Sequence, residues 1–250
     1  MFEGSWVALI TPMTTQGQID YTGLQRLVDF HLENGTAGLV LMGTTGEAAT
    51  ISLDEQLDVL RAVIAQVKGR MALVAGNGAN DTAEAVRKTK LMSTLAIDGF
   101  LTVTPYYNKP TQKGMLLHYQ AVAAATDKAV LLYNVPGRTG VDLQASTVAE
   151  LAAVSNIVGI KEATGSMARL TELQQRCPAD FLLLSGDDAS AAQFMLQGGQ
   201  GVISVTTNVA PKAMAELCQA ARGSEAFWRL ALTVLLTACT SRPVVSASTN

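Results

Sequence analysis

The chain has 250 residues, of which 48% are hydrophobic and 16% charged, and its formal net charge at pH 7 is -3. This length is ample for one large core, and the slightly acidic balance excludes the basic surface that a nucleic-acid partner requires. The chain lacks both an apolar run long enough to span a membrane and the basic start of a secretory signal. Its three cysteines are odd in number and far apart, which predicts reduced core thiols. We therefore expect a soluble, cytoplasmic protein without nucleic-acid or membrane partners.

Short apolar runs alternate along the chain with longer segments of helical periodicity. In the first unit, an apolar run at 5–11 precedes a helical pattern for which Asp20 is the expected N-cap. In the second unit, Ser52 and Glu55 have the spacing of a capping box. The predicted strands span 5–11, 37–42, 71–75, 99–103, 129–133, 157–160, 181–184 and 201–204, and the predicted helices span 21–34, 52–67, 81–95, 113–126, 144–154, 166–176, 188–196 and 211–221.

This alternation determines the predicted fold class. Strands that alternate with helices form parallel sheets through right-handed crossovers. Eight such units in about 220 residues favour a closed (β/α)8 barrel over an open doubly wound sheet. The first strand is also not followed by a glycine-rich dinucleotide fingerprint. We predict an α/β protein with a catalytic barrel over 1–223, followed by a separate, atypical C-terminal segment over 224–250.

The most informative residue is Lys161, which follows the apolar run at 157–160. At the carboxyl end of a buried strand its ammonium is poorly hydrated, and this lowers its pKa. A partly neutral lysine is a nucleophile for carbonyl compounds and forms a Schiff base. The alternative is a strand-end lysine whose ammonium simply reaches water.

Residues at the neighbouring strand ends favour the Schiff base, because all of them meet at one rim of a barrel. Tyr133 ends the fifth strand and is placed to pass a proton, while Thr44 and Tyr107 supply further hydroxyls for a relay. Arg138 follows the fifth strand and suits a second carboxylate. Taken singly, each has an ordinary structural alternative, such as a core cap, a turn hydrogen bond or a surface loop.

Other candidate sites are weaker. The glycine-rich stretch 198–201 precedes the eighth strand, so we place it at the opposite, stability face of the barrel and reject it as a phosphate site. His31 and His118 lie within helical patterns and have no cysteine or carboxylate at metal-ligand spacing, so we expect no metal. Asp187 and Asp188 are expected to cap a helix rather than to bind a cation.

Three motifs together resemble the pyruvate-dependent class I aldolase superfamily and, within it, the dihydrodipicolinate synthase family. They are Gly43-Thr44-Thr45-Gly46-Glu47, the stretch from Tyr133-Asn134-Val135-Pro136 to Arg138-Thr139-Gly140, and Gly159-Ile160-Lys161-Glu162-Ala163. The resemblance runs almost continuously from residue 1 to about residue 223.

The resemblance implies that pyruvate condenses with Lys161 and that the resulting enamine attacks L-aspartate-4-semialdehyde. Cyclisation then gives 4-hydroxy-tetrahydrodipicolinate, the first committed step of lysine (diaminopimelate) biosynthesis. No cofactor is implied, because the substrate is held covalently on Lys161. The relay would comprise Tyr133, Thr44 and Tyr107. Tyr107 would reach into the neighbouring subunit, which implies a homodimer or a homotetramer.

The resemblance also assigns the substrate contacts. Thr45 would bind the pyruvate carboxylate, Gly186 and Ile203 would line the site, and Arg138 would hold the semialdehyde carboxylate. The pair Thr44-Thr45 and Arg138 favour the synthase over a related lyase acting on a sialic or 2-keto-3-deoxy sugar acid. That lyase and a catalytically inactive barrel are the alternatives.

Two departures from the family pattern carry predictions. Relatives that are inhibited by lysine bind it at a site to which Ala49, Asn80, Glu84 and Tyr106 correspond. Ala48, Leu53 and Gln56 stand where those relatives often have a serine and two histidines, so we predict weak or absent lysine inhibition. The segment 224–250 does not match the family pattern and has the character of a truncated or frameshifted end, which leaves assembly open.

Overall fold

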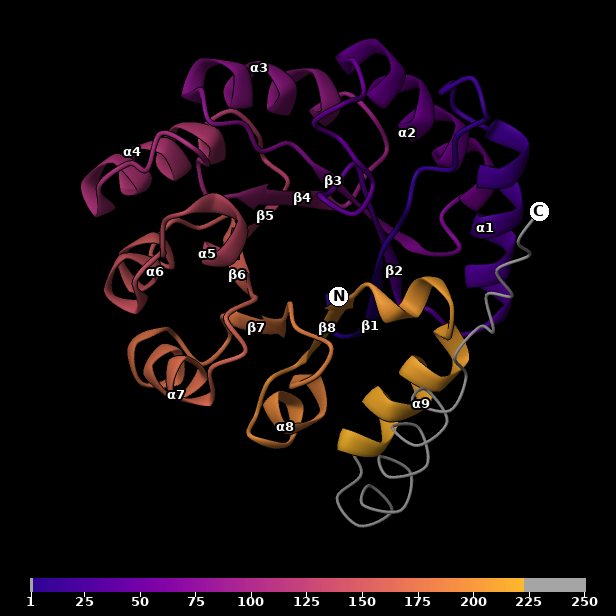
Figure 1. Ribbon diagram of the computed structural model, residues 1–250. Helices are drawn as coiled ribbons and strands as arrows, with labels where there is room; N and C mark the ends of the chain where they lie inside the picture. Colours follow the sequence, from indigo (N-terminus) through magenta and orange to yellow (C-terminus); the bar gives the residue numbers. More distant parts are fainter. Residues whose placement is uncertain (1, 223–250) are drawn as a thin grey trace, which may run out of the picture.

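Eight parallel strands close into a barrel in the order β1 to β8, with helices around the outside (Figure 1). The computed structural model describes residues 2–222, and the predicted segment 224–250 lies outside them. The strands are β1 Gly4–Ala8, β2 Gly38–Leu41, β3 Ala72–Gly76, β4 Gly99–Val103, β5 Ala129–Asn134, β6 Ile157–Glu162, β7 Leu182–Ser185 and β8 Gly201–Ser204. The last strand pairs with the first, with Ile203 opposite Trp6. The predicted (β/α)8 barrel is therefore confirmed.

The helices follow the predicted order. They are α1 Tyr21–Glu33, α2 Leu53–Val67, α3 Thr82–Ser93, α4 Gln112–Ala123, α5 Pro136–Thr139, α6 Ala145–Leu151, α7 Met167–Arg176, α8 Ala191–Leu196 and α9 Pro211–Arg222. The predicted caps form: Asp20 accepts a hydrogen bond from the first turn of α1, and Ser52 and Glu55 make the reciprocal bonds of a capping box on α2. Within residues 2–222, every helix is too short or too polar to cross a membrane.

The first predicted strand was too long. Its prediction ran to residue 11, whereas β1 ends at Ala8. The backbone N–H of Ile10 donates to Oδ1 of Asn208 at 3.1 Å instead of to a neighbouring strand. A side chain far away in the sequence thus ends the strand, and no local pattern reports it.

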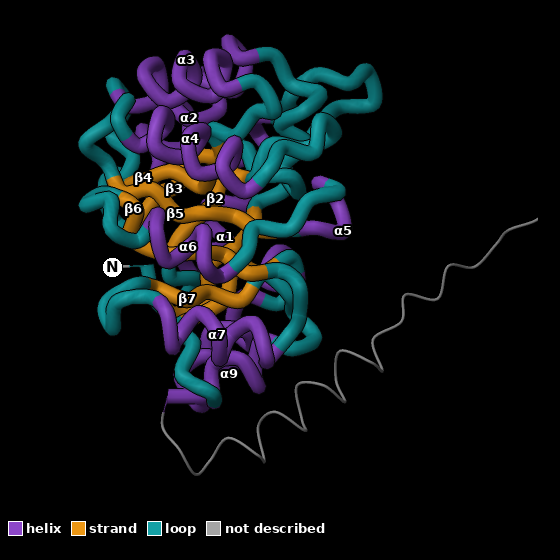
Figure 2. Tube along the Cα trace, turned by 90° about the vertical axis from the view of Figure 1, so that its left-hand side faces the viewer, coloured by secondary structure: helices purple, strands orange, loops and turns teal. Residues whose placement is uncertain are grey.

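The helix α5 was not predicted. Pro136 occupies its first turn, where a fixed φ and a missing N–H cost nothing, and Gly140 ends it at a φ of 74°. This short helix carries Arg138. Figure 2 shows α5 on the side of the barrel opposite to the N-terminus, which is the side where the carboxyl ends of the strands meet.

The core has an inner and an outer part. Inside the barrel, alternate strand residues such as Val40, Leu101, Leu131 and Leu184 pack against one another. Outside it, the other strand residues pack against the helices, in two large clusters around α1–α2 and around α4, α6 and α7. Layered side chains fill such a barrel and leave only its rim open to a ligand. A ligand site is therefore expected at the carboxyl ends of the strands, where barrels of this kind have their active sites.

Cysteines and histidines hold structural positions. Cys177 is half-buried and Cys218 is buried, and Cys239 lies outside the described residues. Nδ1 of His31 is 2.9 Å from the hydroxyl of Thr36, and Nδ1 of His118 is 2.9 Å from the hydroxyl of Thr82. Burial lowers the pKa of both imidazoles to about 4, so both are neutral near pH 7.

Candidate active site

Lys161 lies inside the barrel because β6 contains an irregularity. The pairing of β5 with β6 shifts between Val130 and Leu131, after which Leu131 lies opposite Gly159 and Tyr133 opposite Lys161. Without the shift, Ile157 and Lys161 would share a face, since side chains alternate along a strand. With it, Ile157 packs under the helices while Lys161 faces inward with Tyr133. A Cβ at residue 159 would lie 2.5 Å from the carbonyl oxygen of Leu182, so only glycine fits at this position.

The Lys161 amine is almost completely removed from water. The residue is 4% exposed, and its Nζ lies 4.5 Å from the centre of the Tyr133 ring. Burial lowers the pKa of Lys161 to about 8; Asp188 opposes this shift and Arg138 adds to it. A substantial fraction of this amine is therefore neutral near physiological pH.

Gly186 and Ile203 complete the surroundings of the lysine. A Cβ at residue 186 would lie 2.9 Å from Cε of Lys161 and 2.7 Å from Cβ of Ala163, so this glycine makes room for the lysine side chain. Ile203 is 1% exposed and packs in the inner cluster that also contains Tyr133 and Leu184. Both residues thus lie around the base of the site.

Tyr133 lies between Lys161 and the cavity: its ring contacts the amine and also lines the cavity wall. Burial raises the pKa of the Tyr133 phenol, and this is opposed by the charge of Arg138 and by a side-chain hydrogen bond with Thr44. The phenol therefore keeps its proton near neutrality and can donate it. The structure brings together Lys161, Tyr133, Thr44 and Arg138 from the ends of three strands, β2, β5 and β6.

A cavity of about 270 Å³ opens above this group. Its walls come from the segments that follow β2, β3, β4 and β5, and the lining includes Thr44, Ala49, Lys88, Tyr106, Tyr133 and Arg138. Lys161 is covered by Tyr133 and is not part of the wall itself. Thr45 is half-buried in the loop after β2 and also does not line the cavity. The space suits a substrate of a few carbon atoms with one or two carboxylates.

Tyr107 is not part of this arrangement within one chain. It is 87% exposed and its φ is 74°, a left-handed conformation that is unusual for an aromatic residue. Its backbone N–H donates to the carbonyl oxygen of Thr139 at 3.3 Å, which ties the loop to α5 while the ring points away from the molecule. Tyr133 and Thr44 are thus joined by a hydrogen bond, whereas Tyr107 lies apart from both within one chain.

Of the four residues predicted for the lysine site, two line the cavity and two do not. Ala49 and Tyr106 line the cavity described above. Asn80 accepts a hydrogen bond at its carbonyl from Asn108, and the carboxylate of Glu84 receives two hydrogen bonds from Arg87, at 2.7 and 2.8 Å. The Gln56 amide donates to the backbone carbonyl oxygens of Ala48 and Ile51 at 2.9 Å, so it holds the loop between β2 and α2 in place.

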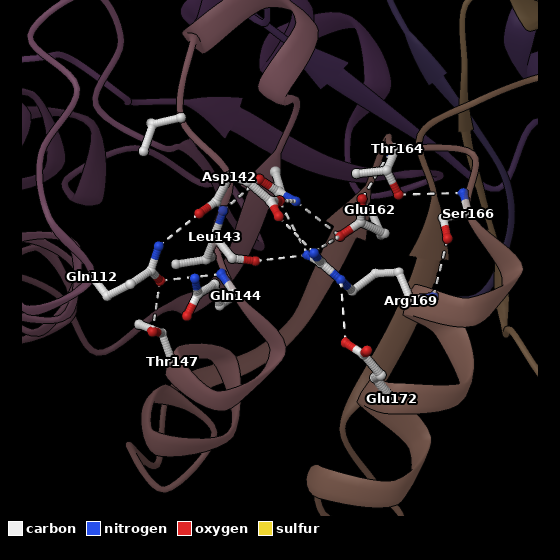
Figure 3. A network of polar contacts seen from close by, with 12 residues as sticks. Gln112, Asp142, Leu143, Gln144, Thr147, Glu162, Thr164, Ser166, Arg169 and Glu172 are labelled. Carbon is white, nitrogen blue, oxygen red and sulfur yellow. Dashed lines mark hydrogen bonds and ion pairs between the residues drawn. The ribbon is translucent and has the colours of Figure 1, made fainter.

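A polar network on the outer face of β5 and β6 holds the strands that carry Tyr133 and Lys161 (Figure 3). Asn134 and Glu162 directly follow those residues and lie opposite each other in the sheet. The Asn134 amide donates to Oδ1 of Asp142 at 2.8 Å and to Oε2 of Glu162 at 3.0 Å. Arg169 of α7 binds both oxygens of Asp142, at 2.6 and 3.1 Å, and its Nη1 is 3.7 Å from Glu162. The network therefore joins β5 and β6 to α7.

The same network fixes the loop that follows Arg138. The Asn134 carbonyl oxygen Oδ1 accepts from the backbone N–H of Leu143, and Gln112 of α4 donates to the backbone carbonyl of Asp142 at 2.7 Å (Figure 3). Glu162 is 2% exposed, and burial raises its pKa although Asn134, Thr164 and Arg169 oppose the rise. Burial also raises the pKa of Asp142, but its hydrogen bonds with Arg169 and Asn134 outweigh this and hold it below 3.8.

Comparisons with known proteins agree with this geometry. A sequence model described as the Dihydrodipicolinate synthetase family matches residues 1–235. The chain belongs to this family.

Several members of the dihydrodipicolinate synthase family are closely similar. The 4-hydroxy-tetrahydrodipicolinate synthase of Shewanella sp. strain W3-18-1 is 53% identical over 232 residues, which cover 93% of this chain and 79% of the relative. That of Pseudoalteromonas atlantica is 55% identical over 221 residues, covering 88% and 75%. The crystal structure of the chloride-inhibited dihydrodipicolinate synthase from Acinetobacter baumannii complexed with pyruvate is 44% identical, with a TM-score of 0.90 and coverage of 98% and 86%.

Three parts of this family member's site were missed by the sequence analysis. Asp187 and Asp188 were expected at a helix N-cap. Asp188 instead accepts hydrogen bonds from the backbone N–H groups of Val205 and Thr206, at 3.1 and 2.8 Å. Its negative charge also raises the pKa of Lys161. Lys88 lines the cavity from α3. Arg169 lies on α7, and its only local signal was an i,i+3 pairing with Glu172. All three act across elements that the sequence does not place side by side.

The pKa of Lys161 predicts how imine formation depends on pH. At subsaturating pyruvate, the initial rate of trapping with borohydride should rise about tenfold per pH unit well below pH 8, because only the neutral amine attacks. It should level off above about pH 8, as the pKa requires. A rate that keeps rising beyond pH 10 would show an ordinary lysine. Asp188→Asn should move the levelling to lower pH, because Asp188 raises this pKa.

The network predicts a stability difference between two arginine variants. Arg169→Met should lower the free energy of unfolding at pH 7 by about 1–3 kcal/mol, because it leaves Glu162 buried beside an unpaired Asp142. Arg61→Met is the matched control: its ion pair with Asp58 is exposed, so we expect a change within about 0.5 kcal/mol.

Urea denaturation at several pH values measures both variants. Since the pKa of Asp142 is lowered in the folded state, its contribution is present above its ordinary value of 3.8 and is lost as the pH falls below it. The deficit of Arg169→Met should therefore shrink at low pH. Equal stability of the two variants at pH 7 would contradict a role for Arg169 in holding β5 and β6.

Proposed function

We propose that the chain catalyses the condensation of pyruvate with L-aspartate-4-semialdehyde to 4-hydroxy-tetrahydrodipicolinate and water. The observation that carries this proposal is the buried Lys161 amine, with a pKa of about 8, against the phenol of Tyr133. The relatives at 53% and 55% identity bear the name of this synthase. The A. baumannii structure is named as a pyruvate complex.

The first half of the reaction takes place on pyruvate. The neutral Nζ of Lys161 attacks the ketone carbon and forms a carbinolamine, which loses water to give an imine. Tyr133, which keeps its proton and is hydrogen-bonded to Thr44, supplies a proton to the departing hydroxyl. The phenolate of Tyr133 then takes a proton from the methyl carbon, which gives the enamine and restores the phenol. The imine itself withdraws the electrons, so the chemistry needs no bound cofactor.

The second half uses the aldehyde. The enamine carbon attacks the aldehyde carbon of the semialdehyde, and Tyr133 donates a proton to the oxygen that becomes the hydroxyl. The amino group of the semialdehyde then attacks the imine carbon, closes the ring and releases Lys161. Arg138 lines the cavity and is a bidentate partner suited to the carboxylate of this second substrate. Thr45 is assigned to the pyruvate carboxylate.

Tyr107 completes the relay from a second copy of the chain. Its ring is 87% exposed and lies outside the cavity of its own chain, although its loop is tied to α5. A large exposed aromatic residue on a strained loop tip is suited to insert into a partner. We therefore propose a homodimer in which each active site is formed by two chains.

Mass spectrometry with a turnover assay tests the activity. Pyruvate and borohydride should add one reduced pyruvyl group to the native chain and to Lys90→Ala, an exposed-lysine control, but none to Lys161→Ala. Turnover with L-aspartate-4-semialdehyde should fall by roughly three or more orders of magnitude in Lys161→Ala. An adduct with turnover only on N-acetylneuraminate would assign a lyase instead. A folded native chain that forms no adduct would refute the Schiff base.

Mixed dimers test the role of Tyr107. Tyr107→Phe and Lys161→Ala are each expected to be nearly inactive. Coexpressed in equal amounts, they should recover about a quarter of native activity, because half of the dimers are mixed and each mixed dimer has one intact site. If Tyr107 acts within its own chain, or if the chain is a monomer, the mixture will stay as inactive as its components.

A further inference from the structure

The two carboxylate oxygens of Asp188, in the loop after β7, have different surroundings. Oδ2 accepts hydrogen bonds from the backbone N–H groups of Val205 and Thr206, at 3.1 and 2.8 Å, and from the Thr206 hydroxyl at 2.7 Å. Oδ1 is buried and receives no hydrogen bond from residues 2–222. A buried carboxylate oxygen without a donor is unfavourable, so a ligand that donates a hydrogen bond to it is stabilised.

This carboxylate belongs to the surroundings of Lys161. Tyr133 lies on β5, on one side of β6, and the loop that carries Asp188 follows β7, on the other side. In that loop, a Cβ at residue 186 would lie 2.9 Å from Cε of Lys161, so the backbone there passes directly against the lysine side chain. Asp188 is two residues further on. Within residues 2–222, the charges that shift the pKa of Lys161 are those of Asp188 and Arg138.

The proposed reaction brings an ammonium group to the same place. To close the ring, the amino nitrogen of the semialdehyde must bond to the imine carbon, which is itself bonded to Nζ of Lys161. An amino group is mostly protonated near neutral pH and then has no lone pair for the attack, so a base must first remove a proton. The described residues that line the cavity include no aspartate or glutamate. Asp188 is therefore the carboxylate placed to receive this ammonium group.

We propose that Oδ1 of Asp188 binds the ammonium group of the second substrate and takes the proton whose loss allows ring closure. The inference rests on the proposed function, because Asp188 has this role only if the acceptor aldehyde carries an amino group. The carboxylate on the same carbon of the substrate then points away from Lys161, toward Arg138.

The protons of the ring-closing step balance. The ammonium group gives one proton to Oδ1 of Asp188, and the freed lone pair forms the bond to the imine carbon. A second proton passes from this nitrogen to Nζ of Lys161 while the bond between Nζ and that carbon breaks. Lys161 leaves as a neutral amine, and the ring is released as a protonated imine. The ring and Asp188 then lose their protons to water.

Succinic semialdehyde separates this step from the earlier ones. It has the aldehyde and the carboxylate of L-aspartate-4-semialdehyde but lacks the amino group. On the pyruvate-loaded chain it forms the carbon–carbon bond and cannot close a ring, so its adduct stays on Lys161, where borohydride traps it for intact mass measurement.

The variants are Asp188→Asn and, as a matched control, Asp187→Asn. Asparagine keeps one oxygen for the N–H groups of Val205 and Thr206 and lacks the negative charge. The carboxylate of Asp187 is occupied by the hydroxyl and the backbone N–H of Ser190, at 2.6 and 3.0 Å. Circular dichroism verifies that each variant is folded.

Near the Lys161 pKa of about 8, Asp188→Asn should lower kcat with L-aspartate-4-semialdehyde by roughly a hundredfold. The open-chain adduct of both substrates should then accumulate on Lys161. Adduct formation from succinic semialdehyde should stay within about threefold of the native rate. The changed pKa of Lys161 cannot cause the loss, because removing the charge of Asp188 makes more of the amine neutral. Asp187→Asn should change both rates by less than about threefold.

Equal losses with both aldehydes would overturn the proposal, because Asp188 would then only hold the loops after β7 and β8 together. Native turnover in Asp188→Asn would overturn it as well and would leave Tyr133 as the base. A larger loss in Asp187→Asn would assign the ammonium group to the neighbouring aspartate instead. In all three results the native chain remains active, so the proposed function stands. A native chain that forms no pyruvyl adduct, or that turns over only N-acetylneuraminate, would refute the proposed function and this role of Asp188 with it.

Discussion

The structure depends on one constraint: an amine must be kept out of water and still be reachable by a substrate. A closed barrel satisfies the first requirement, because its interior is filled by layers of apolar side chains and Lys161 replaces one of them. Removal from water lowers the pKa of the amine to about 8 and makes it a nucleophile. The open rim satisfies the second requirement. The negative charge of Asp188 raises the pKa of Lys161 and so limits the lowering that burial causes.

The two faces of β6 have complementary tasks. Lys161 faces inward, and the next residue, Glu162, faces outward into a buried network of Asn134, Asp142 and Arg169. Because Asn134 and Glu162 lie opposite each other directly after the pair Tyr133 and Lys161, this network fixes the register at the point where the side chains of that pair meet. Buried polar groups that are fully hydrogen-bonded favour one arrangement over its alternatives. The chemistry inside is thus supported by polar contacts outside.

The electrostatics of the cavity extend beyond the lysine. Arg138 lowers the pKa of both Lys161 and Tyr133, so the residue proposed to bind a substrate carboxylate also tunes the two groups proposed to do the chemistry. Binding of a carboxylate to Arg138 neutralises part of this influence. In the proposed reaction, substrate binding and proton transfer are therefore coupled through one guanidinium group. Lys88 adds positive charge on another wall of the same cavity.

Much of this protein could be predicted from local patterns. The periodicity of apolar residues predicts all eight strand and helix units, since burial on one face requires that spacing whatever the neighbours are. Caps such as Ser52 with Glu55 are equally local. The motif residues Thr44, Tyr133, Arg138 and Lys161 could be placed at one rim, because the carboxyl ends of parallel strands must meet.

Other features were decided only by the tertiary structure. The irregularity that turns Lys161 inward depends on a pairing between β5 and β6, and the end of β1 depends on Asn208. The roles of Asp188, Lys88 and Arg169 arise from contacts between elements far apart in the chain. The exposure of Tyr107 is visible only when its loop is placed on the folded barrel. Sequence patterns report which face of an element is buried, whereas desolvation and charge depend on what the fold places around each group.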